Sequence, residues 1–70
     1  MMPLTLAAPG VELKIVKLCG LDKTQCRLQD MEFVPGSIVE LICINNGNVI
    51  CKIKDTRIAI DRDLAMRIMV

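Results

Sequence analysis

The fold is decided by the stretch from Ser37 to Ile60, which reads SIVELICINNGNVICKIKDTRIAI. Apolar and polar residues alternate on both sides of Asn45-Asn46-Gly47-Asn48, a pattern typical of two β-strands joined by a tight turn. Asp55-Thr56 then makes a short connection into Arg57-Ile58-Ala59-Ile60. We therefore expect a hairpin followed by a third strand of the same meander.

The hairpin can close in two ways, and the choice decides which side chains are buried. The first strand carries three alternating apolar residues, Val39, Leu41 and Cys43. A two-residue loop, Asn46-Gly47, would place them on one face with Ile50 and two lysines. A three-residue loop, Asn46 to Asn48, would place them with Cys51 and Ile53. Because a slip of one residue moves every side chain to the other face, the apolar pattern favours the three-residue loop, with Cys43 opposite Cys51.

This register leaves apolar residues on the outer face of the hairpin. They are Ile42, Ile44 and Ile50, with Glu40, Lys52 and Lys54 around them. An apolar centre with a charged rim is typical of a protein-binding surface. The alternative, that the helix or the last strand covers the isoleucines, stays open. The residues predicted to bind a partner are Ile42, Ile44, Ile50 and Lys52.

The segment before the hairpin predicts one bent strand and one helix. After the turn at Pro9-Gly10, residues 11–15 alternate, with Val11, Leu13 and Ile15 inward, and the phase breaks over residues 16–18.

The helix is expected from about Lys23 to Met31. Asp22 and Gln25 would form a capping box at its start, and Pro35-Gly36 would prevent its continuation.

The end of the chain predicts how the sheet closes. Asp61 or Asp63 would cap a single turn of 3-10 helix, and Ile68-Met69-Val70 would form a last strand against the first. The fold class is therefore mostly β: a small SH3-like five-stranded β-barrel with one short α-helix and a 3-10 turn. Seventy residues make a single domain, 1–70.

Composition excludes several classes of function. The chain has nine basic and eight acidic residues, and Phe33 is its only aromatic residue, so nucleic-acid binding is not expected. No apolar run is long enough to insert into a membrane, and the start lacks the basic region of a signal peptide, so we expect a cytoplasmic protein. Without histidine, a paired serine or a phosphate loop, no catalytic residue is predicted and the chain is not expected to be an enzyme.

The four cysteines are interpreted as small buried apolar residues in the reduced state. They are Cys19, Cys26, Cys43 and Cys51. No C-x-x-C pair and no histidine is present, so no metal site and no cofactor is predicted. The competing interpretation is that thiolates of Cys43 and Cys51, on adjacent strands, share a soft metal ion. Met31, Met66 and Met69 are interpreted as core residues.

One decapeptide carries a family resemblance. Arg27 to Gly36 reads RLQDMEFVPG and is similar to the R-L-x-x-M-G-F-x-P-G signature of the ferrous iron transport protein A (FeoA) family. Residues 15–20 and 56–60 resemble that family as well, in the same order. Glu32 departs from the family's Gly, where a left-handed residue would end the helix.

The resemblance implies a function. It implies a cytosolic, non-enzymatic accessory of ferrous iron uptake that binds the FeoB membrane permease, with transition metal ion binding as a family property. A similar domain forms the C-terminus of iron-dependent repressors of the diphtheria toxin repressor type. The alternatives are a free-standing regulatory domain that binds a peptide, and a metal carrier that uses cysteine thiolates.

Overall fold

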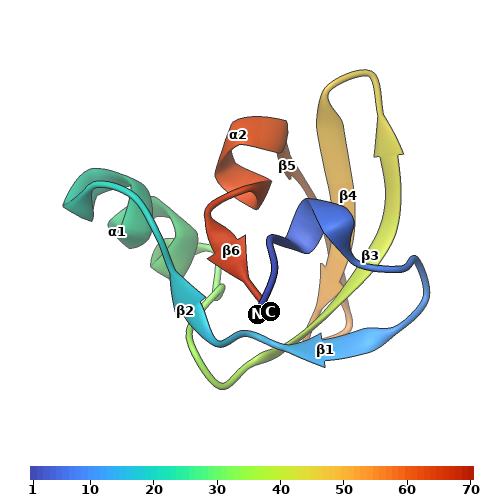
Figure 1. Ribbon diagram of the computed structural model, residues 1–70, viewed down its shortest axis with the longest axis horizontal. Helices are drawn as coiled ribbons and strands as arrows, with labels where there is room; N and C mark the ends of the chain where they lie inside the picture. Colours follow the sequence, from blue (N-terminus) through green and yellow to red (C-terminus); the bar gives the residue numbers. More distant parts are fainter.

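The strands form two small sheets. The computed structural model describes residues 1–70 and is mostly β (Figure 1). The strands are β1 (Glu12–Lys14), β2 (Lys17–Leu18), β3 (Ile38–Asn45), β4 (Asn48–Ile53), β5 (Thr56–Asp61) and β6 (Ile68–Met69). The helices are the 3-10 helix η1 (Leu4–Leu6), α1 (Asp22–Asp30) and α2 (Arg62–Ala65).

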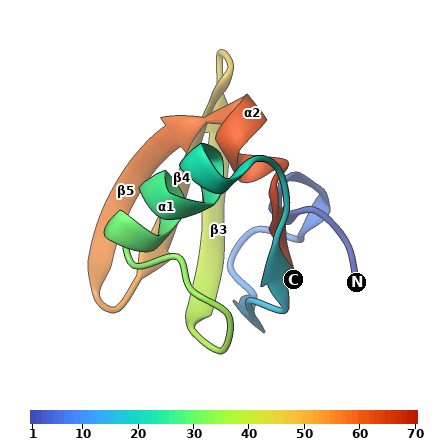
Figure 2. The ribbon, with the colours of Figure 1, turned by 90° about the vertical axis from the view of Figure 1, so that its left-hand side faces the viewer.

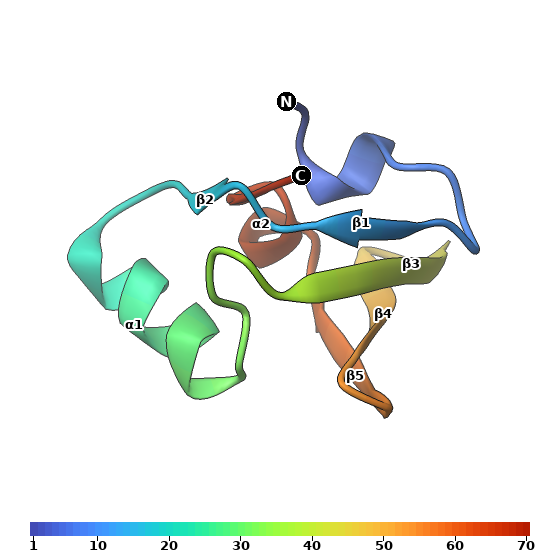
Figure 3. The ribbon, with the colours of Figure 1, turned by 90° about the horizontal axis from the view of Figure 1, so that it is seen from below.

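The bent strand of the sequence links the two sheets. One sheet has the order β1-β3-β4-β5, and the other pairs β2 with β6. β1 continues into β2 across a bend at Ile15-Val16, so the chain passes from one sheet to the other (Figure 3). Counted as one bent strand, β1 and β2 complete the five strands that the sequence predicts. This agrees with the expected SH3-like architecture, but the two sheets meet only at this bend and do not close into a barrel, because β5 and β6 are not paired.

The register expected for the hairpin is wrong. β3 and β4 are joined by a two-residue turn with Asn45 opposite Asn48 and Cys43 opposite Ile50. Asn46 and Gly47, the turn residues, have φ of 47° and 86°, as a type I′ turn requires. The prediction failed because it assumed a regular ladder.

Farther from the turn, a β-bulge in β3 shifts the pairing of β3 with β4 by one residue. The pairing shifts between Leu41 and Cys43, so that Ile42 is the extra residue of β3. Beyond the bulge, Leu41 lies opposite Cys51 and Val39 opposite Ile53. The tight turn and the apolar pairing are thus both satisfied, which a regular ladder could not achieve.

Helix α1 begins one residue earlier than expected and without the predicted capping box. Leu21 is its N-cap and makes no side-chain capping bond. Gln25 does reach back, but its Nε2 donates to the carbonyl of Gly20 at 3.0 Å. At the other end, Glu32 has φ of 70°, so it takes the left-handed conformation for which the family has Gly.

The two ends of the chain are held together by strand pairing and backbone hydrogen bonds. β6 pairs with β2, which confirms that the last strand closes against the first. Met2 and Val70 exchange two backbone hydrogen bonds, of 3.0 and 2.8 Å, and the termini lie side by side in Figure 1. The turn after β5, expected to be a 3-10 helix, is the short α-helix α2. The 3-10 helix of the structure is η1, near the start of the chain.

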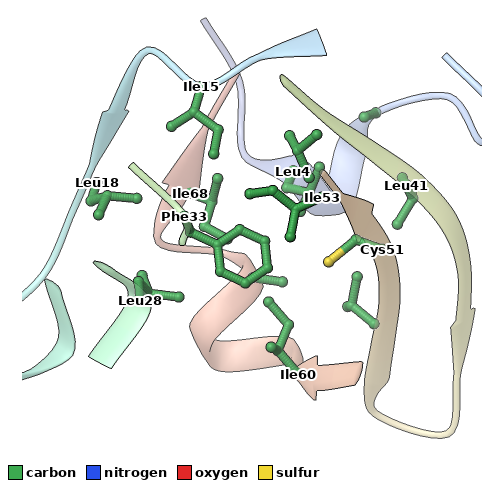
Figure 4. Close-up of a cluster of buried hydrophobic side chains, with 14 residues drawn as sticks. Leu4, Ile15, Leu18, Leu28, Phe33, Leu41, Cys51, Ile53, Ile60 and Ile68 are labelled. Atoms are coloured by element: carbon green, nitrogen blue, oxygen red, sulfur yellow. The ribbon is translucent and has the colours of Figure 1, made fainter. Parts of the chain in front are cut away.

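The core is entirely apolar and draws on every part of the chain. Phe33, the only aromatic residue, is fully buried between α1 and the sheets (Figure 4). The fourteen buried residues are Leu4, Ala7, Ile15, Leu18, Leu28, Phe33, Val39, Leu41, Val49, Cys51, Ile53, Ile60, Ala65 and Ile68.

The sequence wrongly predicts that Val11, Met66 and Cys43 point inward. Val11 and Met66 are exposed because each lies at the margin of its element, and Cys43 is exposed because of the register.

Candidate partner-binding surface

The outer face of the four-stranded sheet is the candidate binding surface. We use "outer face" for the side opposite the buried residues of β3 and β4. Directly paired residues of an antiparallel sheet share a face, so Cys43, Ile50 and Ala59 form one apolar row across it. Ile42, the bulge residue, stands beside this row. η1 and α2, by contrast, contribute Leu4 and Ala65 to the core on the other side.

Three of the four predicted site residues lie on the outer face. Ile42 and Ile50 are half-buried there, and Lys52 is exposed one row away, opposite Glu40. Ile44 lies elsewhere, because it pairs with the buried Val49 and so belongs to the core side, 43% exposed at the end of the hairpin. The bulge is the reason, since it reverses the faces of β3 between Leu41 and the turn.

A charged depression of about 290 Å³ lies on the same face. It is lined by Glu12, Ser37, Ile38, Glu40, Lys52, Lys54 and Asp55. Glu12 lies directly opposite Glu40, a like-charge pair that is unfavourable by itself. Lys52 flanks Glu40 on its other side and offsets that repulsion.

Of the three carboxylates of the depression, the sequence places only Glu40 at this surface and gives no sign of Glu12 or Asp55 there. Only the long-range pairing of β1 with β3 brings Glu12 beside Glu40. No local pattern predicts this pairing, because the two strands are separated by α1 in the chain.

The cysteines do not form the pair that a shared metal would need. Cys43 lies on the outer face and Cys51 in the core, so their side chains point to opposite sides of the sheet. The prediction that all four are buried is wrong: Cys26 and Cys43 are exposed and Cys19 is half-buried.

Cys51 is also chemically unsuited to metal binding. Burial raises the pKa of its thiol to about 11, and its Sγ lies 3.6 Å from the carbonyl oxygen of Ile58, to which it donates. The thiol therefore stays protonated at neutral pH, whereas a metal needs the thiolate.

The structure offers no ligand set for the metal that the family resemblance implies. Nowhere do three side chains of His, Cys, Asp or Glu come together in a metal-binding arrangement.

None of the helices has the length and apolar character that crossing a membrane requires.

Comparison with known proteins identifies relatives over the whole chain. A curated protein of Methanocaldococcus jannaschii, named "Putative Fe(2+) transport protein A", is 40% identical over 70 residues, which are 100% of this chain and 85% of that protein. The crystal structure of an iron uptake regulatory protein, FeoA, superposes with a TM-score of 0.86 at 28% identity, covering 97% of this chain and 90% of the other.

The fold itself recurs more widely. FeoA of Stenotrophomonas maltophilia, solved with zinc and described as an SH3 domain protein, has a TM-score of 0.84 at 20% identity, over 99% of this chain and 88% of that one. A manganese-dependent transcriptional repressor has a TM-score of 0.83 at 12% identity, and the matched region is 38% of its chain. The expected likeness to a domain of metal-dependent repressors is thus confirmed for the fold. The model of the FeoA domain matches residues 2–70, so this chain belongs to the FeoA family.

Proposed function

We propose that this chain is a non-enzymatic, cytosolic accessory protein of ferrous iron uptake that binds the cytosolic part of a FeoB-type permease. Membership of the FeoA family and the 40% identity to an archaeal protein named for Fe(2+) transport support the role in iron uptake. In this role the chain binds the permease and catalyses no reaction of its own.

The outer face is the observation that carries the docking part of the proposal. It combines the apolar row of Cys43, Ile50 and Ala59 with a charged depression that includes Lys52. Apolar groups at the centre of an interface supply affinity, and charges at its rim fix orientation and partner choice. Ile42 and Ile50 are half-buried already, so each gains less than the roughly 1.5–3 kcal/mol of a fully exposed isoleucine.

The mixed charge of the depression indicates what the partner presents. Lys52 and Lys54 stand among three carboxylates, those of Glu12, Glu40 and Asp55. A partner segment that carries both a basic and an acidic side chain beside an apolar one would match this pattern. Such a segment is expected of a folded protein surface, whereas a nucleic acid offers only negative charge.

A pull-down of the permease's cytosolic part tests this role. Lys52→Glu should reduce the amount captured, because it reverses the charge at the rim without touching the core. Lys23→Glu makes the same change on the exposed side of α1 and should capture as much as wild type. Equal capture by all three proteins would place docking away from the outer face, and no capture by wild type would contradict the adaptor role.

A further inference from the structure

β5 is an edge strand whose free side is not occupied by any other segment. It is the last strand in the order β1-β3-β4-β5. Figure 2 shows it at the outer margin of the molecule, with α1 and β4 on one side and nothing beyond it on the other. None of the turn, loop or cap hydrogen bonds uses a backbone group of residues 56–61. An uncovered edge of this kind is a template for pairing with another strand.

The β4–β5 turn determines which backbone groups point outward. Lys54 and Asp55 have φ of 47° and 65°, and Ile53 lies opposite Thr56, which is the geometry of a two-residue turn. The backbone groups of Thr56 therefore face β4, and the alternation of the strand turns those of Arg57 and Ala59 toward the free edge. The N–H of Asp61 points the same way, whereas its carbonyl belongs to α2, of which it is the N-cap.

The sequence of this edge is complementary to itself. It reads Arg57-Ile58-Ala59-Ile60-Asp61. In an antiparallel pair of two copies centred on Ala59, Arg57 of each copy lies opposite Asp61 of the other, and Ile58 lies opposite Ile60. Both charged residues are exposed, and both are odd-numbered, so they share the outer face with Ala59.

We propose that β5 is the surface through which two copies of this chain pair, so that their sheets join into one continuous sheet across a twofold axis at Ala59. Ala59 of each copy exchanges both hydrogen bonds with Ala59 of the other, and Asp61 N–H donates to the carbonyl of Arg57. The half-buried Ile58 loses its remaining exposure against Ile60 of the second copy.

Charge selects this register over its neighbours. Moving the axis to Ile58 would place Arg57 opposite Ala59, and moving it to Arg57 would place two guanidinium groups together. Only the axis at Ala59 pairs both charges with opposite ones. The outer face stays open in this arrangement, so a dimer presents two copies of the candidate binding surface side by side. The proposal does not depend on the role in iron uptake.

Sedimentation equilibrium of the full chain tests the pairing. An interface limited to one strand edge is small, so the dimer should form between about 10 µM and about 1 mM. Arg57→Asp should raise the dissociation constant about tenfold or more, because two like-charge pairs replace two opposite ones. Asp61→Arg should do the same, and the double variant with both changes should return to within about threefold of wild type.

Ala59→Pro provides a test that does not rely on charge. Its N–H points to the free edge, so proline in both copies removes the two hydrogen bonds between the Ala59 residues and leaves the ladder with β4 intact. This variant should be monomeric throughout the range, with the circular dichroism spectrum of wild type. The proposal is overturned if wild type is monomeric at about 1 mM, if the folded Ala59→Pro variant still dimerises, or if the charge-swapped double variant fails to recover.

Discussion

The backbone N–H of Phe33 donates a 2.9 Å hydrogen bond to the carbonyl of Leu28, and both side chains are fully buried. The N–H of Glu32 donates to Gln29 at 2.9 Å, which completes a Schellman motif at the end of α1. The apolar contact that accompanies this motif is here the Leu28–Phe33 pair (Figure 4). The helix end thus delivers the only aromatic side chain to the centre of the core.

Glu32→Gly should stabilise the protein. With φ of 70°, Glu32 holds a left-handed conformation that costs a non-glycine residue on the order of 1 kcal/mol. We expect the free energy of unfolding, measured with urea, to rise by about 1 kcal/mol.

Glu32→Ala separates the backbone effect from the charge. Glu32 also forms an ion pair with Lys54, at 3.6 Å, but both side chains are mostly exposed, so its contribution is small. Ala removes this pair and retains the strained backbone, and its stability should stay within about 0.5 kcal/mol of wild type. If Ala stabilises as much as Gly, backbone strain is not the cause.

Cys51 should make the protein less stable at alkaline pH. Its pKa is raised from 9.0 to about 11 by burial, so the unfolded thiol ionises first as the pH rises. Between pH 9 and 11 the unfolded state therefore binds fewer protons than the folded state, and the free energy of unfolding falls, by about 2–3 kcal/mol in all. Below pH 9 both states are protonated and Cys51 causes no change.

Cys51→Val isolates this effect. Valine is of similar size and does not ionise, so the difference between wild type and variant cancels the titration of every other group. Between pH 9 and 11 the free energy of unfolding should fall further for wild type than for Cys51→Val, so the difference between them should change in favour of the variant. A difference that stays constant over this range would mean that the buried thiol ionises as readily as an unfolded one.

The thiols should differ sharply in their rate of modification. Cys26 and Cys43 are exposed, Cys19 is half-buried and Cys51 is buried. With a thiol reagent at pH 8, two groups should react quickly and Cys51 only after unfolding. Cys43→Ser should remove one of the two fast reactions. If it removes the slow one instead, Cys43 faces the core and the hairpin has the three-residue loop after all.

Much of the fold could be predicted from the sequence, because local patterns determine it. Alternation located β3, β4 and β5, and Pro35-Gly36 marked the end of the helical segment. The register of the hairpin could not be predicted in this way. A regular ladder closed by Asn46-Gly47 cannot place Leu41 on the same face as Cys51, and only a bulge at Ile42 reconciles the turn with that shared face. A bulge has no dependable sequence signal, since it depends on how both ends of the ladder pack.

The candidate site could be predicted only in part for the same reason. Ile42, Ile50 and Lys52 lie on the outer face as expected, because the bulge leaves their side of the strand unchanged. Ile44 lies between the bulge and the turn, so it changed faces. The charged depression depends on the pairing of β1 with β3, a contact between segments far apart in the chain.

The affinity for the permease's cytosolic part, measured by titration calorimetry with wild type and Ile50→Thr, tests the central claim most directly. Threonine keeps the branched shape that suits a strand but removes apolar surface from the middle of the outer face. Leu21→Thr is the control, because Leu21 is the most exposed of the large apolar residues and lies at the start of α1. We expect Ile50→Thr to weaken binding about tenfold, with its fold intact by circular dichroism, and Leu21→Thr to bind like wild type. Unchanged affinity of a folded Ile50→Thr variant would contradict docking through the outer face.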